Sequence, residues 1–140
     1  MNRIIMFFKA KSIGLLIGIL WATLSCFTNT LDPAQAIGVS MQTGEAHQLA
    51  TYFDKDLELR IDPVGVNFSS IQANQAEMIM RSFFRKYPPN RFQTVDQGNT
   101  PHLKYTTGTY WSGSRTFQVN VLMHQVTPGH YLIHSILVND

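Results

Sequence analysis

One amphipathic segment, residues 70–87, constrains the fold of this chain more than any other part of the sequence. Its apolar residues recur at the spacing of three and four that gathers side chains on one stripe of a helix. They are Ala76, Ile79, Met80, Phe83, Phe84 and Tyr87. Ser69 and Gln72 have the spacing of a capping box at the helix start. The proline pair after Tyr87 ends the helix, because proline lacks the backbone donor. We therefore predict a helix of roughly 25 Å that the rest of the domain covers.

The remaining sequence predicts short helices and strands around this helix. Residues 37–41 and 45–53 have helical spacing, whereas residues 57–61 alternate with the period of two that is typical of a half-buried strand. A turn and a short strand at 66–68 follow. Four more strands are predicted after the prolines, at residues 91–97, 103–111, 116–126 and 130–138. Tight turns join them, which favours an antiparallel meander. We therefore predict an α+β fold with a bent antiparallel sheet curled around the long helix.

The last two predicted strands each carry an apolar face. In strand 116–126 this face consists of Phe117, Val119, Val121 and Met123, and in strand 130–138 of Tyr131, Ile133, Ser135 and Leu137. A three-residue loop at 127–129 would turn both sets toward the helix. The opposite side would then carry Asn120, Leu122, His124, Leu132, His134, Ile136 and Val138. Because this second face is also largely apolar, we expect a protein partner or a homodimer through the open sheet face.

Residues 1–36 have the features of an export signal. Three basic residues precede an apolar run at 13–27, and a small-x-small pattern ends at Ala36. We predict cleavage after Ala36 and an exported domain, periplasmic or secreted, formed by residues 37–140. Two alternatives are an uncleaved N-terminal membrane anchor and a lipid attached to Cys26, the only cysteine.

Charge and cysteine content exclude two classes of protein for residues 37–140. This part of the chain has eight Lys and Arg and eight Asp and Glu, so its formal net charge is zero. Without a basic surface we expect no nucleic-acid partner. It also contains no cysteine, so a hydrophobic core rather than a disulfide framework must stabilise it.

The sequence from residue 37 to 138 resembles a family of small exported bacterial proteins known as domain of unknown function 4783. The motifs that carry the resemblance include Thr43-Gly44-Glu45-Ala46, Phe83-Phe84-x-Lys86-x-Pro88-Pro89 and Lys104-Tyr105-x-x-Gly108-Thr109. The chain departs from the family at His124-Gln125, where the family tends to be more basic. The resemblance implies a cystatin-like fold of the nuclear-transport-factor-2-like kind. It implies no chemistry, because related folds serve as enzymes, binding modules and dimerisation domains.

The histidines and one aspartate are the candidates for chemistry. A metal site needs three or four convergent ligands, and the five histidines contain no His-x-His pair, so we expect rim histidines and neither a metal nor another cofactor. Enzymes of the cone fold that the resemblance implies often use a carboxylate or histidine inside the cone. The candidates are Asp96, His134 and His124. Asp96 shares strand parity with Phe92 and Thr94 and would face the concavity, unless it only begins the next turn.

Aromatic residues suggest a ligand pocket. If the long helix leaves space inside the cone, then Tyr52, Phe84, Tyr105, Thr107 and Trp111 would line a pocket for a small apolar ligand. The alternative is that the aromatic residues close the core completely.

Three hypotheses for function follow. The first is an exported, non-catalytic binding or interaction module. The second is a small isomerase or dehydratase that uses a carboxylate or histidine inside the cone. The third is a membrane-tethered accessory protein.

Overall fold

The computed structural model describes residues 31–140, and most of the predicted export signal, with Cys26, lies outside the described residues. Two N-terminal helices, α2 (Pro33–Thr43) and α3 (Ala46–Ala50), precede strand β1 (Phe53–Ile61). A short 3₁₀ turn connects β1 to β2 (Val66–Gln72), which leads into the longest helix, α4 (Ala73–Lys86). The remaining strands are β3 (Arg91–Asn99), β4 (Leu103–Ser112), β5 (Arg115–Thr127) and β6 (His130–Asn139).

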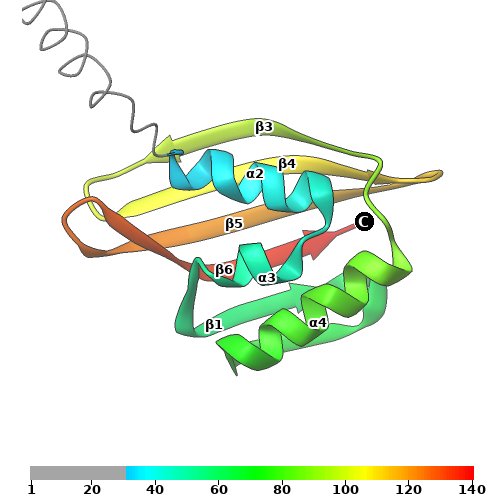
Figure 1. Ribbon diagram of the computed structural model, residues 1–140, viewed down its shortest axis with the longest axis horizontal. Coiled ribbons are helices and arrows are strands. Elements are labelled where there is room, and N and C mark those ends of the chain that lie inside the picture. Colours follow the sequence, from blue (N-terminus) through cyan, green and yellow to red (C-terminus); the bar gives the residue numbers. More distant parts are fainter. Residues whose placement is uncertain (1–30) are drawn as a thin grey trace, which may run out of the picture. The chain divides into compact units, whose positions relative to one another are not determined.

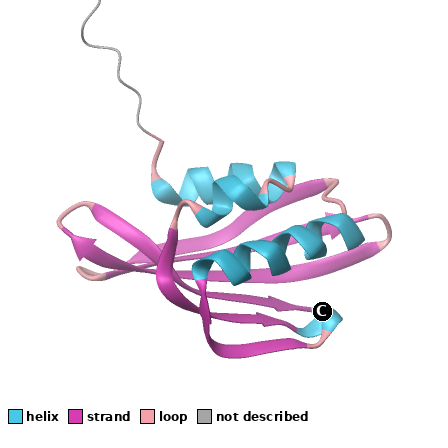
Figure 2. Ribbon diagram, turned by 60° about the horizontal axis from the view of Figure 1, so that its bottom comes forward, coloured by secondary structure: helices cyan, strands magenta, loops and turns pink. Residues whose placement is uncertain are grey.

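The six strands form one curved sheet in the order β2-β1-β6-β5-β4-β3. Neighbouring strands are antiparallel except β1 and β6, which are parallel. Helices α2, α3 and α4 all lie on the same face of the sheet (Figures 1 and 2). We call this the helix face and the opposite one the outer face. The predicted α+β class, with a bent sheet around a long helix and short N-terminal helices, is confirmed.

Helix α2 begins before the predicted cleavage site. Pro33 occupies its first turn, where the missing backbone donor of proline costs nothing. Ala36 is 8% exposed and packs in the core, and its carbonyl accepts a hydrogen bond from Ser40 Oγ at 3.0 Å. Gly44 ends the helix with φ of 70°, a left-handed conformation that favours glycine. The folded part of the chain therefore starts upstream of residue 37, and cleavage after Ala36 stays a prediction.

Among residues 31–140 no helix is both long enough and apolar enough to cross a membrane.

Helix α4 starts later than the sequence predicts. The predicted capping box of Ser69 and Gln72 is wrong, because both residues belong to β2, which pairs with β1 through Leu57↔Ile71 and Leu59↔Phe68. Gln72 precedes the helix in an extended conformation and its side chain makes no capping hydrogen bond. Residues that the local capping pattern places at the start of the helix are thus part of a paired strand instead. The predicted end at the proline pair is confirmed.

An aromatic cluster fills the space between α4 and the sheet. The ring of Phe83 lies 5.4 to 5.9 Å, centroid to centroid, from four other aromatic rings. These rings belong to Phe84, Tyr87, Tyr110 and Phe117. Separations of this size are typical of favourable edge and offset contacts. The hydroxyl of Tyr110 donates to the carbonyl of Tyr87, and burial raises the pKa of the Tyr110 phenol. The aromatic residues of the cone therefore form a closed core at this point.

A bulge in β6 reverses part of the predicted side-chain alternation. The predicted helix-facing set of β5 is confirmed, since all four of its residues are buried. The pairing with β6, however, is irregular. Leu122 of β5 pairs with Ser135 of β6, and Met123 of β5 pairs with Ile133, so His134 is an extra residue in β6. Beyond the bulge, Ile136 and Val138 turn to the helix face and are fully buried. The predicted placement of Ser135 and Leu137 on that face is wrong, because the bulge exchanges them for the β-branched side chains of Ile136 and Val138.

Candidate functional site

A shallow groove of about 350 Å³ lies on the outer face of the sheet. Residues from four adjacent strands, β1, β6, β5 and β4, border it, and two of them, Thr106 and Val121, have buried side chains on the helix face. The lining residues are Glu58, Tyr105, Thr106, Thr107, Asn120, Val121, Leu122, His134, Ser135 and Leu137. No helix among the described residues covers this face. The groove therefore combines aromatic, aliphatic and polar groups on a surface open to a partner.

Two polar pairs frame the groove. Thr107 Oγ1 donates a hydrogen bond to Asn120 Oδ1 at 2.9 Å, which joins β4 to β5. Ser135 Oγ lies 3.4 Å from Glu58 Oε2 and joins β6 to β1. These pairs hold polar side chains in place on the sheet and leave aliphatic surface between them. Such an arrangement of apolar area with a few fixed polar groups is typical of binding sites.

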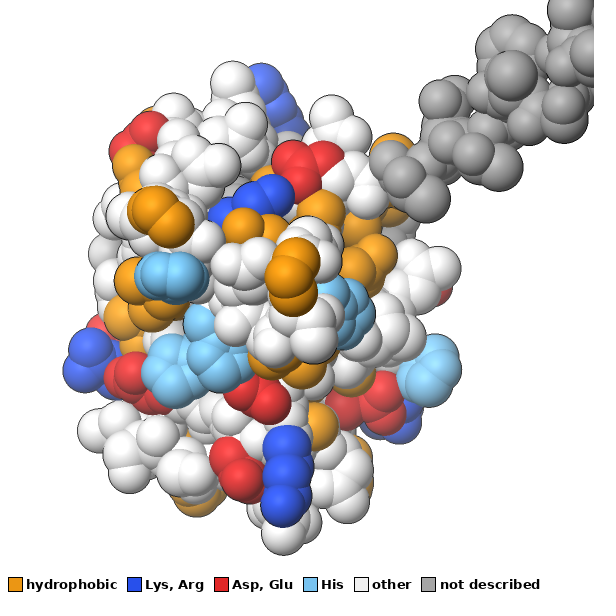
Figure 3. Space-filling model, turned by 90° about the vertical axis from the view of Figure 1, so that its left-hand side faces the viewer, with side chains coloured by type: hydrophobic (Ala, Val, Ile, Leu, Met, Phe, Trp, Pro, Cys, Tyr) orange, Lys and Arg blue, Asp and Glu red, His pale blue; other side chains and the backbone are white. Residues whose placement is uncertain are grey.

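Asp54, His124 and His134 converge at one end of the outer face. Their ligand atoms all lie within 4.8 Å of one another. His124 Nε2 is 2.5 Å from Asp54 Oδ2, and the two imidazole rings stack with centroids 5.2 Å apart and planes inclined by 24°. Histidine and acidic side chains gather together on this end of the molecule (Figure 3). The predicted placement of His124 and His134 on the same side of the sheet is confirmed.

Asp96 does not face the concavity, so the prediction from strand parity is wrong. Thr94 pairs with Gly108 and Asp96 with Thr107, which leaves Val95 as an extra residue in β3. This bulge turns Asp96 to the outer face, where Tyr105 Oη lies 3.4 Å from Asp96 Oδ2. The three residues predicted as catalytic candidates thus all lie on the outer face.

The five predicted pocket residues do not line one cavity. Phe84 is in the core, and Tyr52 packs against the core with its carbonyl bonded to the amide of Ile133 at 2.6 Å. Tyr105 and Thr107 line the outer groove, to which Tyr105 contributes a side chain that is 42% exposed. Trp111 is half-buried at another place in β4, with the guanidinium of Arg91 4.9 Å from its ring centroid. The structure thus brings together only Tyr105 and Thr107.

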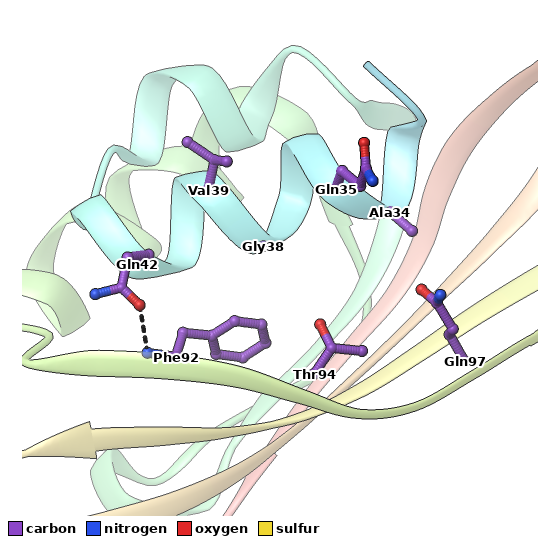
Figure 4. A pocket seen from close by; sticks show the side chains of 8 residues that line it. All are labelled: Ala34, Gln35, Gly38, Val39, Gln42, Phe92, Thr94 and Gln97. Carbon is purple, nitrogen blue, oxygen red and sulfur yellow. Dashed lines mark hydrogen bonds between the residues drawn. The ribbon is translucent and has the colours of Figure 1, made fainter.

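A second cavity, of about 430 Å³, lies between α2 and the edge strand β3 (Figure 4). The described residues that line it are all uncharged: Ala34, Gln35, Gly38, Val39, Gln42, Phe92, Thr94 and Gln97. Gln42 Oε1 accepts a hydrogen bond from the backbone amide of Phe92 at 2.7 Å. The helix therefore occupies part of the exposed edge of β3, which is a common way to block edge pairing with another chain.

Sequence reasoning missed Asp54 as a member of the histidine cluster. Asp54 is the second residue of β1, and His134 lies in β6, so nothing in their spacing along the sequence links them. They meet because β1 and β6 pair in parallel, with Phe53 beside Ile133. The available signal was the pair His124 and His134 on one face, to which a carboxylate from a neighbouring strand could have been added.

Comparison with known proteins identifies relatives of the same fold. The family model "Domain of unknown function (DUF4783)" matches residues 34–139. A DUF4783 protein from Bacteroides ovatus is 23% identical, with a TM-score of 0.68 over 74% of this chain and 90% of that one. Another from Bacteroides uniformis is 21% identical, with a TM-score of 0.69 over 76% and 94%. An uncharacterised cystatin-fold protein from Novosphingobium aromaticivorans has 11% identity and a TM-score of 0.58 over 77% and 95%.

No curated protein of established annotation matches the chain.

Proposed function

The chain belongs to the DUF4783 family, whose function is unknown, and we propose that it is an exported, non-catalytic interaction module that binds a partner through the outer face of its sheet. Export rests on the signal features of residues 1–36. Binding rests on the groove that four strands build on a face that no helix of residues 31–140 covers.

The observation that carries this proposal is the contrast between the two faces of the sheet. On the helix face, Phe83 and its neighbouring rings occupy the space in which a ligand of the cone would sit. On the outer face, Leu122 and Leu137 are only half-buried and Tyr105 is 42% exposed. Exposed apolar surface among polar groups marks interaction sites. The catalytic alternative loses support, because Asp96, His124 and His134 all lie outside the cone.

A second copy of the chain is the partner that we propose for this face. Residues 37–140 have no net charge, so two copies approach without long-range repulsion. The groove offers both donors and acceptors, including Asn120, Ser135 and Glu58, which suits a surface that must match itself. A twofold interface of this kind places the same residues on both sides. A small apolar ligand in the groove is the alternative occupant.

Sedimentation equilibrium of the protein and two variants tests the proposal. Concentrations from about 1 μM to about 1 mM span weak and moderate dimers. We expect the wild type to approach the mass of a dimer and Leu122→Glu, which places a charge in the groove, to remain a monomer. Met78→Glu is the matched control, because Met78 is 63% exposed on α4, on the helix face. A wild type that stays monomeric, or a control variant as impaired as Leu122→Glu, would overturn self-association through this face.

A further inference from the structure

We propose that Asp54, His124 and His134 form a binding site for one divalent transition-metal ion, for which Zn²⁺ is the best match. The inference stands on the geometry of these three side chains and does not depend on whether the outer face binds a second copy.

Three adjacent strands build the site. His124 lies on β5 opposite Leu132 of β6. His134 is the bulged residue of β6, opposite the step from Leu122 to Met123 in β5. The imidazole ring of His134 stacks on that of His124. Strand β1 runs parallel to β6 and Phe53 pairs with Ile133, so Asp54 leaves the paired position close to His134. Backbone pairing places His124 directly, and the paired neighbours Phe53 and Ile133 place Asp54 and His134, so the sheet supports the site, as a metal site requires.

The separations suit a small cation. Zinc binds imidazole nitrogen and carboxylate oxygen at about 2.0 to 2.2 Å, so its tetrahedral ligand atoms lie roughly 3.3 to 3.6 Å apart. The ligand atoms of this cluster lie within 4.8 Å of one another. Binding of the ion would draw the more distant ligand atoms together and would move His124 Nε2 and Asp54 Oδ2, which lie 2.5 Å apart, away from each other through side-chain rotations. Two imidazoles and one carboxylate are a donor set that zinc commonly accepts, with the fourth position left for water or a ligand.

The hydrogen bonds of the cluster leave the metal-ligating atoms of His124 and Asp54 available. Asp54 Oδ1 accepts the amide hydrogen of Lys55 at 2.7 Å, which orients the carboxylate. Asp54 Oδ2 lies 2.5 Å from His124 Nε2. However, His124 Nε2 is buried and has no aligned hydrogen bond with any described residue. A buried nitrogen that contacts a carboxylate oxygen without an aligned hydrogen bond retains part of the cost of its desolvation. A cation bound to His124 Nε2 and Asp54 Oδ2 removes that cost and neutralises the carboxylate.

Isothermal titration of the full-length chain with Zn²⁺, after treatment with a chelator, tests the site. We expect one ion per chain. Removing even a residue that only supports a metal ligand costs about 10- to 100-fold in affinity, so His124→Ala, His134→Ala and Asp54→Asn should each lose at least that much.

His47→Ala is the matched control. His47 lies on α3, on the helix face, and its Nδ1 is 2.9 Å from Glu77 Oε1. This is also a histidine beside a carboxylate, but without a second histidine. We therefore expect its removal to leave the affinity for Zn²⁺ unchanged. Circular dichroism of each metal-free variant verifies that the fold is intact. If His124→Ala does not fold, His124→Gln is measured in its place.

A spectroscopic measurement identifies the ligands independently. Co²⁺ bound in place of Zn²⁺ should give the visible absorption of a four-coordinate site in the wild type and in His47→Ala, and not in His134→Ala. The proposal is overturned if the wild type binds no stoichiometric Zn²⁺. It is equally overturned if the His124 and His134 variants retain the wild-type affinity, or if the His47 variant loses it.

Discussion

Replacing Phe83 with alanine is the most informative test of the closed core. The side chain is 2% exposed, and its ring contacts the four rings described above at 5.4 to 5.9 Å. Truncation of a buried phenylalanine costs about 3 to 5 kcal/mol, because it removes apolar burial and leaves a cavity. A domain of this size has only about 5 to 15 kcal/mol of stability. We therefore expect Phe83→Ala to lower the free energy of unfolding by roughly a fifth or more.

Urea unfolding followed by circular dichroism measures this loss. Met78→Ala on the same helix is the control, since Met78 is 63% exposed and its truncation should change stability by no more than about 0.5 kcal/mol. An apolar cavity of this kind binds benzene, so benzene should raise the Tm of Phe83→Ala and leave the wild type unchanged. A loss below about 1 kcal/mol for Phe83→Ala would refute a closed core and restore the hypothesis of a ligand pocket inside the cone.

Three further predictions concern stability. Burial raises the pKa of Tyr110 in the folded state. As the pH rises, the unfolded state therefore loses the phenol proton first, and the free energy of unfolding falls above about pH 10. Urea unfolding should detect a steeper fall in the wild type than in Tyr110→Phe, and parallel pH profiles would contradict this. Gly108→Ala places a Cβ 2.2 Å from the Phe92 ring and should cost about 1 to 3 kcal/mol; an unchanged Tm would refute it. A chain that begins at Ile37 loses the first turn of α2 and should be about 1 to 2 kcal/mol less stable than one that begins at Leu31; equal urea midpoints would oppose that.

The sequence predicts the fold where one strong local signal matches the tertiary packing. The stripe from Ala76 to Tyr87 packs on the sheet as expected, because an amphipathic helix of that strength has few other ways to bury its apolar side. The predicted start of the helix was wrong because there the local signal and the tertiary packing disagree. Ser69 and Gln72 satisfy a local capping rule, but pairing of β2 with β1 satisfies more backbone groups.

Bulges explain most of what the sequence could not predict about the site. A period-two pattern determines which side chains share a face only while the pairing is regular. Single extra residues, Val95 in β3 and His134 in β6, turn Asp96 outward and exchange Ser135 and Leu137 for Ile136 and Val138. The parallel pairing of β1 with β6 is equally non-local, and it is this pairing that brings Asp54 to the two histidines.

Methyl NMR at increasing protein concentration tests the central claim most directly, because neighbouring residues of the sheet report on opposite faces. Leu122 and Leu137 line the outer groove, whereas Ile136 and Val138 are buried on the helix face. If the outer face is the interaction surface, the methyl signals of the two leucines shift with concentration and those of Ile136 and Val138 do not. Shifts confined to the helix face, or leucine signals that do not change up to about 1 mM, would contradict the account.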